Sequence, residues 1–311
     1  MKLISFLLIS ALASIAVPAA AMSEWDRLNN ELESLYQQGE YARAIPVAKR
    51  ALEAAEKTLD AENPALATSL NSLALLYNAQ GQYAKAEPLL KRALAIFEKS
   101  MGTESEEVAA TLNNLGMLYK NRGDYLQAEP LYKRALEIDE KVLGSEHPDL
   151  AVSLNNLAQL YQALEQYSKA EPLLKRALAI SEKALGSNHN QVALSLNNLA
   201  LLYAAQKKYA EAEPLLKRVF SISKKTFGPN HPNVAMSLNN LAGVYRDQGK
   251  YPFAEPLFHR ALAISEKAFG PDHPNVATGL ENLAQLYRDI GYSSKAVSLD
   301  KRAAEIRAAK P

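Results

Sequence analysis

The stretch from Ser153 to Lys183 reads SLNNLAQLYQALEQYSKAEPLLKRALAISEK, and it decides the fold because it returns almost unchanged. The copy from Ser195 to Lys225 reads SLNNLALLYAAQKKYAEAEPLLKRVFSISKK. The two copies begin 42 residues apart (195 − 153). Self-similarity at a fixed period of this kind predicts a repeat architecture in which each copy packs against its neighbours.

The same period holds along the chain without an insertion. A leucine column contains Leu70, Leu112, Leu154, Leu196, Leu238 and Leu280. A small-residue column contains Ala74, Gly116, Ala158, Ala200, Ala242 and Ala284. A tyrosine column contains Tyr77, Tyr119, Tyr161, Tyr203, Tyr245 and Tyr287. These columns predict seven units, at about 24–65, 66–107, 108–149, 150–191, 192–233, 234–275 and 276–311.

Each unit contains the apolar pattern of two amphipathic helices. Leu70, Leu73, Ala74 and Tyr77 stand at i, i+3, i+4 and i+7, which is one face of a 3.6-residue helix. The run from Ala86 to Ile96 keeps the same rhythm. Neither helix can bury its apolar face alone, so stacking of neighbouring units must build the core.

Three motifs carry a resemblance to a known family. They are Leu-x-x-Leu-Ala-x-x-Tyr, Gly-x-Tyr-x-x-Ala and Leu-x-x-Ala, and they resemble the tetratricopeptide repeat. The 42-residue form, with LNNLA, AEPLLKRAL and GxxHP, is similar to the repeats of kinesin light chain. The resemblance covers residues 24–308. It implies an all-α, right-handed α-solenoid, a superhelix of about seven helix-turn-helix units, whose first helices line a concave groove that holds peptides.

The N-terminus predicts export. Lys2 is followed by an apolar run from Leu3 to Val17 and then by Pro18-Ala-Ala-Ala21, the order of a secretory signal peptide. The run is about 15 residues long, shorter than the ~20 that span a bilayer. We therefore expect residues 1–21 to be a signal peptide and residues 22–311 to form a periplasmic or secreted solenoid with no stable membrane insertion after cleavage. An uncleaved membrane anchor is the alternative.

Composition argues against several kinds of partner and site. The net charge is +1, which gives no reason to expect nucleic acid or an anionic membrane as a partner. The chain has no cysteine, so it has no disulfide, thiolate nucleophile or Cys metal site. It also lacks a phosphate-binding loop, a His-Glu-x-x-His motif and any polar cluster outside the repeats. We therefore expect a protein that is not an enzyme and that has no cofactor.

Four histidines recur at equivalent points of successive repeats: His147, His189, His231 and His273. Neighbouring helix axes are ~8–10 Å apart, whereas zinc needs ligands at ~2 Å, so equivalent histidines cannot share an ion. Each histidine precedes the next helix, and we expect it to cap that helix rather than to bind a metal.

Asparagine pairs recur inside the first helices, on the face opposite the packing stripe. The candidate peptide-binding asparagines are Asn113, Asn114, Asn155, Asn156, Asn197, Asn198, Asn239, Asn240 and Asn282. A side-chain amide both donates and accepts, which suits it to an extended peptide backbone of any sequence. In the resembled family, asparagines of the first helix hold the ligand backbone. The alternative is that these amides only tie adjacent helices together, and one asparagine of each pair could do each job.

Variable positions on the same face would select ligand side chains. These are the columns that contain Lys120, Gln159, Gln162, Arg246 and Arg288. The two arginines are expected to attract an acidic or C-terminal carboxylate group. In the alternative, each pairs with the neighbouring Asp247 or Asp289, or is solvated.

The Lys-Arg pairs of the second helices form a periodic basic stripe, at 91–92, 133–134, 175–176 and 217–218. Glutamate precedes each of the first three lysines by four residues, the favourable order for an ion pair within a helix. We expect a locally neutralised, solvated outer face.

The sequence thus predicts a scaffold that binds a protein or peptide partner without catalysis. The alternative is a purely structural or self-associating solenoid in an envelope assembly. The identity of the partner and the oligomeric state are not encoded in any feature of the repeats.

Overall fold

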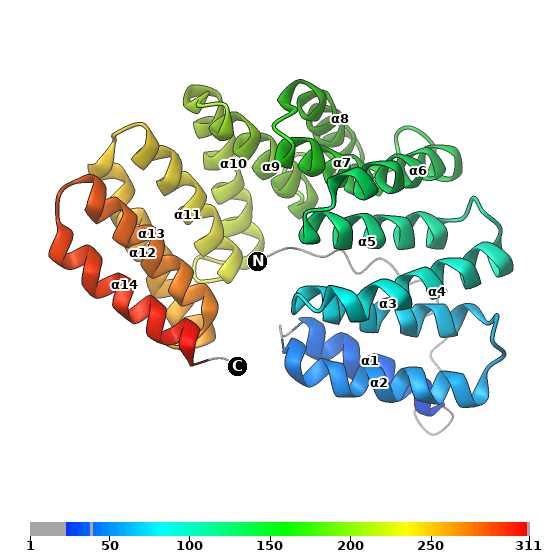
Figure 1. Cartoon of the computed structure of the whole chain (residues 1–311). Helices are drawn as coiled ribbons and strands as arrows, with labels where there is room; N and C mark the ends of the chain where they lie inside the picture. The colour runs from blue at the N-terminus through cyan, green and yellow to red at the C-terminus, as the bar shows by residue number, and fades with distance from the viewer. Residues whose placement is uncertain (1–22, 38–39, 310–311) are drawn as a thin grey trace. The chain divides into compact units, whose positions relative to one another are not determined.

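The computed structural model describes residues 23–37 and 40–309, so the predicted signal peptide lies outside the described residues. Within these ranges the chain forms fourteen helices and no strand (Figure 1). The helices are α1 (Glu24–Gln37), α2 (Tyr41–Thr58), α3 (Pro64–Ala79), α4 (Tyr83–Met101), α5 (Glu106–Arg122), α6 (Tyr125–Leu143), α7 (Leu150–Ala163), α8 (Tyr167–Leu185), α9 (Asn190–Ala205), α10 (Tyr209–Phe227), α11 (Pro232–Asp247), α12 (Tyr251–Phe269), α13 (Pro274–Asp289) and α14 (Ser293–Ala308). None of the helices in this part of the chain combines the length and the apolar character needed to cross a membrane. The predicted all-α class with two helices per repeat is confirmed.

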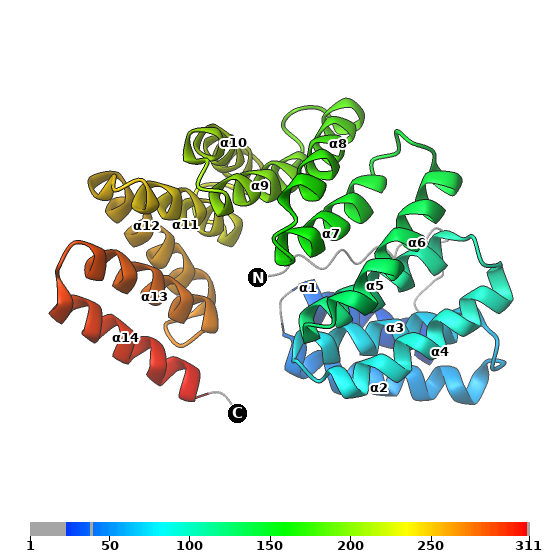
Figure 2. The same ribbon diagram turned by 45° about the horizontal axis from the view of Figure 1, so that its top comes forward.

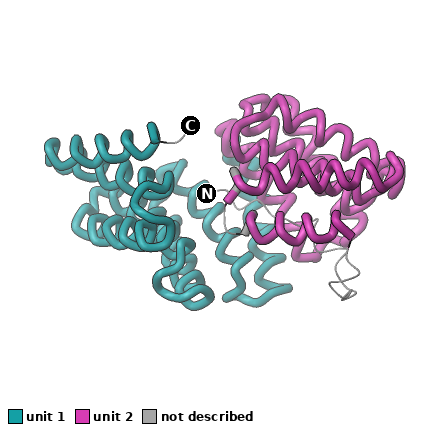
Figure 3. Tube along the Cα trace, turned by 90° about the horizontal axis from the view of Figure 1, so that it is seen from below, with its two compact units in different colours: residues 1–2, 166–311 teal, residues 3–165 magenta. Residues whose placement is uncertain are grey.

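The chain divides into two compact units, coloured separately in Figure 3. The N-terminal unit contains α1–α7 and the C-terminal unit contains α8–α14. Within the N-terminal unit, α3 packs on α4 and α5 packs on α6, and each second helix also contacts the first helix of the next pair. The C-terminal unit repeats this scheme from α8 to α14 (Figure 2).

First helices also contact one another inside each unit. The contacts join α3, α5 and α7 in the N-terminal unit, and α9, α11 and α13 in the C-terminal unit. Residues that stand at equivalent points of two successive first helices are therefore close enough for their side chains to interact. This row of first helices carries the predicted binding residues.

The recurring apolar columns form the core, as the periodicity predicts. All six leucines of the leucine column are at most 1% exposed. The alanine column of the second helices, Ala44, Ala86, Ala128, Ala170, Ala212, Ala254 and Ala296, is likewise at most 1% exposed. Small residues at these points let helix axes approach closely, while leucine and tyrosine fill the space beside them.

Caps at the start of the first helices account for the recurring histidines. His189, His231 and His273 each accept a hydrogen bond at Nδ1 from the backbone N–H two residues further on, at 3.1–3.2 Å. Asn63 does the same for α3 through its Oδ1, at 2.9 Å. The predicted capping role is confirmed for these three histidines. It is wrong for His147, because α7 begins after Asp149 and the His147 ring accepts from the Asp149 N–H, at 3.3 Å, outside the helix. The imidazole of His231 also stacks on Phe227 with ring centroids 4.6 Å apart, and burial lowers the pKa of His231.

The turn within each helix pair requires a residue in the left-handed backbone conformation. Gly249 occupies this position with φ +73°, and Lys207 occupies it one repeat earlier with φ +60°. A residue with a β-carbon is disfavoured there by roughly 1–2 kcal/mol. The repeat therefore tolerates a side chain at this turn, as the sequence indicates, but at some expense in stability.

Candidate binding surface on the first helices

The first asparagine of each pair ties neighbouring repeats together. Asn71 Nδ2 donates to Thr111 Oγ1 at 3.0 Å, and Asn113 Nδ2 donates to Ser153 Oγ at 2.7 Å. Donor and acceptor are 40 residues apart in both cases, so each bond joins one first helix to the next. Asn71, Asn113 and their hydroxyl partners are buried. These are the bonds expected if the amides link repeats.

The second asparagine of each pair reaches back to the preceding repeat. Asn114 Nδ2 donates to Asn71 Oδ1 at 3.3 Å, and Asn156 Nδ2 donates to Asn113 Oδ1 at 3.3 Å. In the C-terminal unit, Asn240 Nδ2 donates to Asn197 Oδ1 at 2.7 Å. We call this set of Asn–Ser/Thr and Asn–Asn bonds the amide ladder.

Burial separates the two asparagine columns. Asn113, Asn155 and Asn197 of the first column are buried, and Asn239 is half-buried. In the second column Asn114, Asn156, Asn240 and Asn282 are half-buried, whereas Asn198 is buried. The Oδ1 atoms of Asn114, Asn156 and Asn240 make no hydrogen bond with the residues that the structure describes. The second column therefore has unused acceptors that are not buried, and its binding role stays a prediction.

The amide ladder changes at its C-terminal end. Asn239 has no hydroxyl acceptor in the next first helix, because Gly279 stands where the other copies have serine or threonine. Asn239 Oδ1 is also buried and has no hydrogen-bond partner among the described residues, whereas Asn71, Asn113 and Asn197 accept at Oδ1 from the asparagine of the next repeat. A buried amide oxygen without a partner is unfavourable, so this junction is the weakest rung of the amide ladder.

Some side chains of the variable columns already make contacts within the chain. Lys120 Nζ donates to Gln159 Oε1 at 2.9 Å, which brings two predicted ligand-selecting residues of successive repeats together. Gln162 is half-buried. The lysine and the glutamine thus form one polar group on α5 and α7.

Both candidate arginines pair with acidic residues of the chain. Arg246 Nη2 donates to Asp247 Oδ1 at 2.8 Å, and its Nε lies 3.6 Å from Asp289 Oδ2. Arg288 contacts Asp300 at 2.5 Å and donates to Gln285 Oε1 at 2.9 Å from Nη2. The predicted intramolecular alternative describes Arg246, whereas Arg288 uses Asp300 rather than Asp289.

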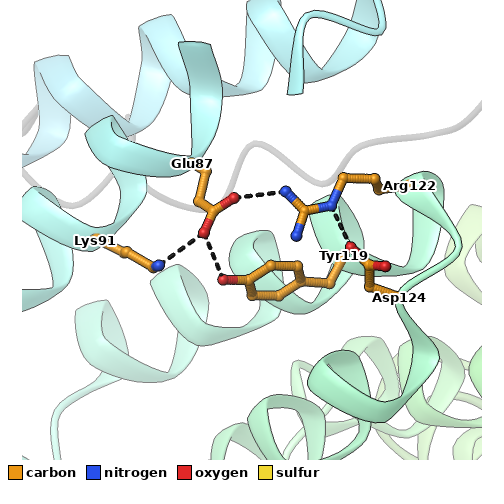
Figure 4. A network of polar contacts seen from close by, with 5 residues as sticks. All are labelled: Glu87, Lys91, Tyr119, Arg122 and Asp124. Atoms are coloured by element: carbon orange, nitrogen blue, oxygen red, sulfur yellow. Dashed lines mark hydrogen bonds and ion pairs between the residues drawn. The ribbon is translucent and has the colours of Figure 1, made fainter. Parts of the chain in front are cut away.

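A tyrosine hydroxyl joins the predicted Glu–Lys pair of the preceding second helix, and this Tyr–Glu contact was not anticipated (Figure 4). Tyr119 on α5 donates its hydroxyl to Glu87 Oε1 on α4 at 2.8 Å. Lys91 Nζ lies 2.7 Å from the same oxygen, and Arg122 Nη1 lies 2.6 Å from Oε2. The ion pair with Lys91, supported by Tyr119 and Arg122, lowers the pKa of Glu87 to about 2 against the opposing effect of burial.

This contact recurs at 32-residue separation, at Tyr161–Glu129, Tyr203–Glu171, Tyr245–Glu213 and Tyr287–Glu255. Both columns are visible in the sequence. What the sequence lacks is the relative rotation of successive helices, which brings the columns together.

One buried carboxyl lies under the amide ladder. Asp139 on α6 accepts a hydrogen bond from Ser153 Oγ, the hydroxyl that also receives Asn113 Nδ2. Other repeats have Ser181, Ser223 or Ser265 at this position. Burial raises the pKa of Asp139 to about 6, although the bond from Ser153 acts in the other direction. The junction between α5 and α7 thus contains a titratable group that the others lack.

Known proteins share this repeat. The model of the tetratricopeptide repeat family matches residues 33–99, 107–183, 165–225, 191–258 and 233–309. A solved structure from Podosopora anserina, a putative kinesin light chain with nearly identical TPR-like repeats, is 33% identical, covers 67% of this chain and 99% of its own, and has a TM-score of 0.56. BtubC (BKLC) from P. vanneervenii is 27% identical, with 74% of this chain and 91% of that chain covered and a TM-score of 0.59.

A more distant structure shows the fold alone. It is a Rap protein complexed with competence and sporulation factor, 17% identical, with 91% of this chain and 74% of that chain covered and a TM-score of 0.70. No curated protein matches the chain.

Proposed function

This chain belongs to the tetratricopeptide repeat family, and from that premise we propose that it is an exported, non-enzymatic scaffold that binds a peptide or protein segment along its first helices. Helical repeats of this kind typically serve as protein-interaction scaffolds. The proposal assigns the binding surface to the row of first helices inside each unit.

The unused oxygens of the second asparagine column carry this proposal. Asn114, Asn156 and Asn240 each donate a hydrogen bond from Nδ2 to the preceding repeat. Their Oδ1 atoms accept no hydrogen bond from the described residues. The carbonyl oxygen of each of these three asparagines can accept from the backbone N–H groups of an extended peptide, whatever its sequence. The first column holds the repeats in register while the second grips the ligand.

The side chains of the variable columns would distinguish one ligand sequence from another. The Lys120–Gln159 group and Gln162 present polar atoms on α5 and α7, and Arg246 and Arg288 present guanidinium groups on α11 and α13. The arginines already contact carboxylates, so an acidic ligand group would have to exchange with Asp247 or Asp300. We therefore assign Arg246 and Arg288 a smaller share of the binding than the amide oxygens.

Export is proposed from the residues before the solenoid. Lys2, the apolar run from Leu3 to Val17 and the Ala-x-Ala end form the order read by secretory machinery. A binding protein in the periplasm or outside the cell fits a chain of near-zero net charge without cysteine. N-terminal sequencing of the exported protein tests this step, and a mature chain that begins at Met22 is the expected result.

Peptide selection tests the binding surface. A phage-displayed peptide library is selected on the mature chain, and the peptides obtained are measured against Asn156→Ala and Asn240→Ala. Thr111→Val is the control, because it removes the hydroxyl bonded by Asn71 without touching an unused oxygen. Affinity lost in the asparagine variants and kept in Thr111→Val supports the proposal.

Equal affinity in all variants, or no selected peptide, would remove the assignment of the amide oxygens. Light scattering of the mature chain addresses the self-associating alternative in parallel. A monomer over the accessible concentration range is expected, whereas concentration-dependent assembly would favour a structural role.

A further inference from the structure

The outer face of the second helices follows a simple pairing rule. In four Lys-Arg pairs the arginine contacts a glutamate 36 residues earlier, in the preceding second helix. The pairs are Arg92–Glu56 at 2.6 Å, Arg134–Glu98 at 2.6 Å, Arg218–Glu182 at 2.5 Å and Arg302–Glu266 at 2.7 Å. A second series joins Lys99 to Glu62 and Lys141 to Glu104, 37 residues earlier. We call these two series the outer ladder.

The outer ladder is interrupted between α10 and α12, both in the C-terminal unit (Figure 1). Lys224 occupies the position that holds glutamate in the other copies, so the residue 36 before Arg260 is a cation. The lysine series lacks its carboxylates both on α10 and on α12. Lys225 and Lys267 have Asn188 and Asn230, rather than a carboxylate, 37 residues earlier.

Four cationic side chains result: Lys224, Lys225, Arg260 and Lys267. All four are exposed, and none makes an ion pair with a residue that the structure describes. The outer-ladder glutamates on either side of Lys224 along the chain are already paired, because Glu182 contacts Arg218 and Glu266 contacts Arg302. The chain has a net charge of only +1, so this group of charges is a local feature.

Arg260 is held in place without a carboxylate. Its guanidinium carbon lies 5.7 Å from the ring centroid of Phe220. This phenylalanine stands where five other copies have leucine and the last copy has Ala304. A guanidinium over an aromatic face keeps its N–H groups at the edge, where they can still donate. The aromatic residue and the missing carboxylate occur at the same junction, so Arg260 is positioned for an anion that the chain does not supply.

We propose that the outer surface formed by Lys224, Lys225, Arg260 and Lys267 binds an acidic peptide segment of a partner protein. The same arginine position binds a carboxylate at about 2.6 Å in four other junctions, so the frame is already suited to glutamate or aspartate side chains. Carboxylates of the partner would form the ion pairs that are missing at these positions of the outer ladder. This surface lies on second helices and is independent of the binding proposed for the first helices.

Fluorescence anisotropy of a labelled alternating Glu-Gly peptide tests the proposal, with the Gln-Gly peptide as the neutral probe. The mature wild-type chain is expected to bind the acidic peptide, and more weakly as NaCl rises from about 50 mM to about 300 mM. Lys224→Glu, which returns a carboxylate to Arg260 within the chain, is expected to reduce the affinity at least about tenfold. Arg260→Gln should act in the same direction.

The matched control is Lys49→Glu, which makes the same charge change at an exposed lysine of α2 in the other unit. It should leave the affinity within about twofold of wild type. Equal losses in Lys49→Glu and Lys224→Glu, or no binding of the acidic peptide, would overturn the proposal. Binding of phosphatidylglycerol vesicles or single-stranded DNA that depends on Lys224, without binding of the acidic peptide, would also overturn it.

Discussion

The ring of Tyr132 lies 3.0 Å from the point that a β-carbon on Gly116 would occupy. The copies with Ala74, Ala158 and Ala200 in the Gly116 column have Leu90, Leu174 and Leu216 in the Tyr132 column, and the copy with Ala242 has Phe258 there. Two departures from the repeat therefore compensate each other inside the pair α5–α6. The tyrosine is fully buried, and its hydroxyl has no hydrogen-bond partner among the described residues.

We expect Gly116→Ala to destabilise the chain by about 1–3 kcal/mol through overpacking against Tyr132. This loss runs against the helix preference for alanine over glycine, which is worth about 1 kcal/mol. The double change Gly116→Ala with Tyr132→Leu should recover the stability. Gly243→Ala is the control, because nothing lies within 4 Å of its new β-carbon, and it should stabilise. Thermal unfolding followed by circular dichroism compares these three variants with the wild type. A Gly116→Ala variant more stable than the wild type would contradict the proposed overpacking against Tyr132.

Asp139 should make stability depend on pH. Its pKa is raised to about 6 by burial, from an ordinary value of 3.8, so the folded chain retains a proton that the unfolded chain has released. Stability therefore falls as pH rises between these two values and stays lower above pH 6. Asp139→Asn should stabilise by about 1–3 kcal/mol at pH 8 and have little effect at pH 4. The exposed Asp272 provides the control Asp272→Asn, and an equal response of both variants at both pH values would disprove the burial effect.

Glu87 should show the opposite dependence. Its pKa is lowered to about 2, from an ordinary value of 4.5, so its stabilising ion pair is complete above pH 4.5 and is lost as pH falls toward 2. Glu87→Gln should cost about 1 kcal/mol at neutral pH and flatten this acid-side loss. Tyr119→Phe and the double variant complete a thermodynamic cycle. Additive effects of the two changes would show that the Tyr119–Glu87 bond contributes no coupling.

The turn at Lys207 offers a route to a more stable chain. With φ +60°, its β-carbon is strained, and Lys207→Gly should raise the free energy of unfolding by about 1 kcal/mol. Lys207→Ala removes the same ammonium but keeps the β-carbon, so it should leave the midpoint of thermal unfolding unchanged. A gain in the alanine variant equal to that in the glycine variant would place the effect in the side chain.

Periodicity was sufficient to predict the fold because both of its signals can be identified in the sequence without knowledge of any contact between helices. The 3.6-residue pattern of Leu70, Leu73 and Tyr77 predicts the helices, and the 42-residue period predicts their stacking. Contacts within one helix were equally accessible, and the Glu87–Lys91 pair forms as expected at 2.7 Å.

Contacts between repeats were harder to predict. The Tyr119–Glu87 and Asn113–Ser153 bonds join columns 32 and 40 residues apart, and which columns meet depends on the rotation between successive helix pairs. Hydrophobic patterning does not encode that angle. The same limit applies to Arg288, whose carboxylate partner comes from α14 rather than from the adjacent Asp289.

Every link of the outer ladder joins one copy to the copy before it at a fixed separation of 36 or 37 residues, which makes the copies interchangeable. Excising residues 66–107 as one block would place Arg134 opposite Glu56 and Lys141 opposite Glu62, and would offer the Thr111 hydroxyl to Trp25 in place of Ser69. No new interface chemistry has to arise for such a splice. Gene duplication or loss can therefore lengthen or shorten this array in steps of one copy, without a new kind of contact between the copies that remain.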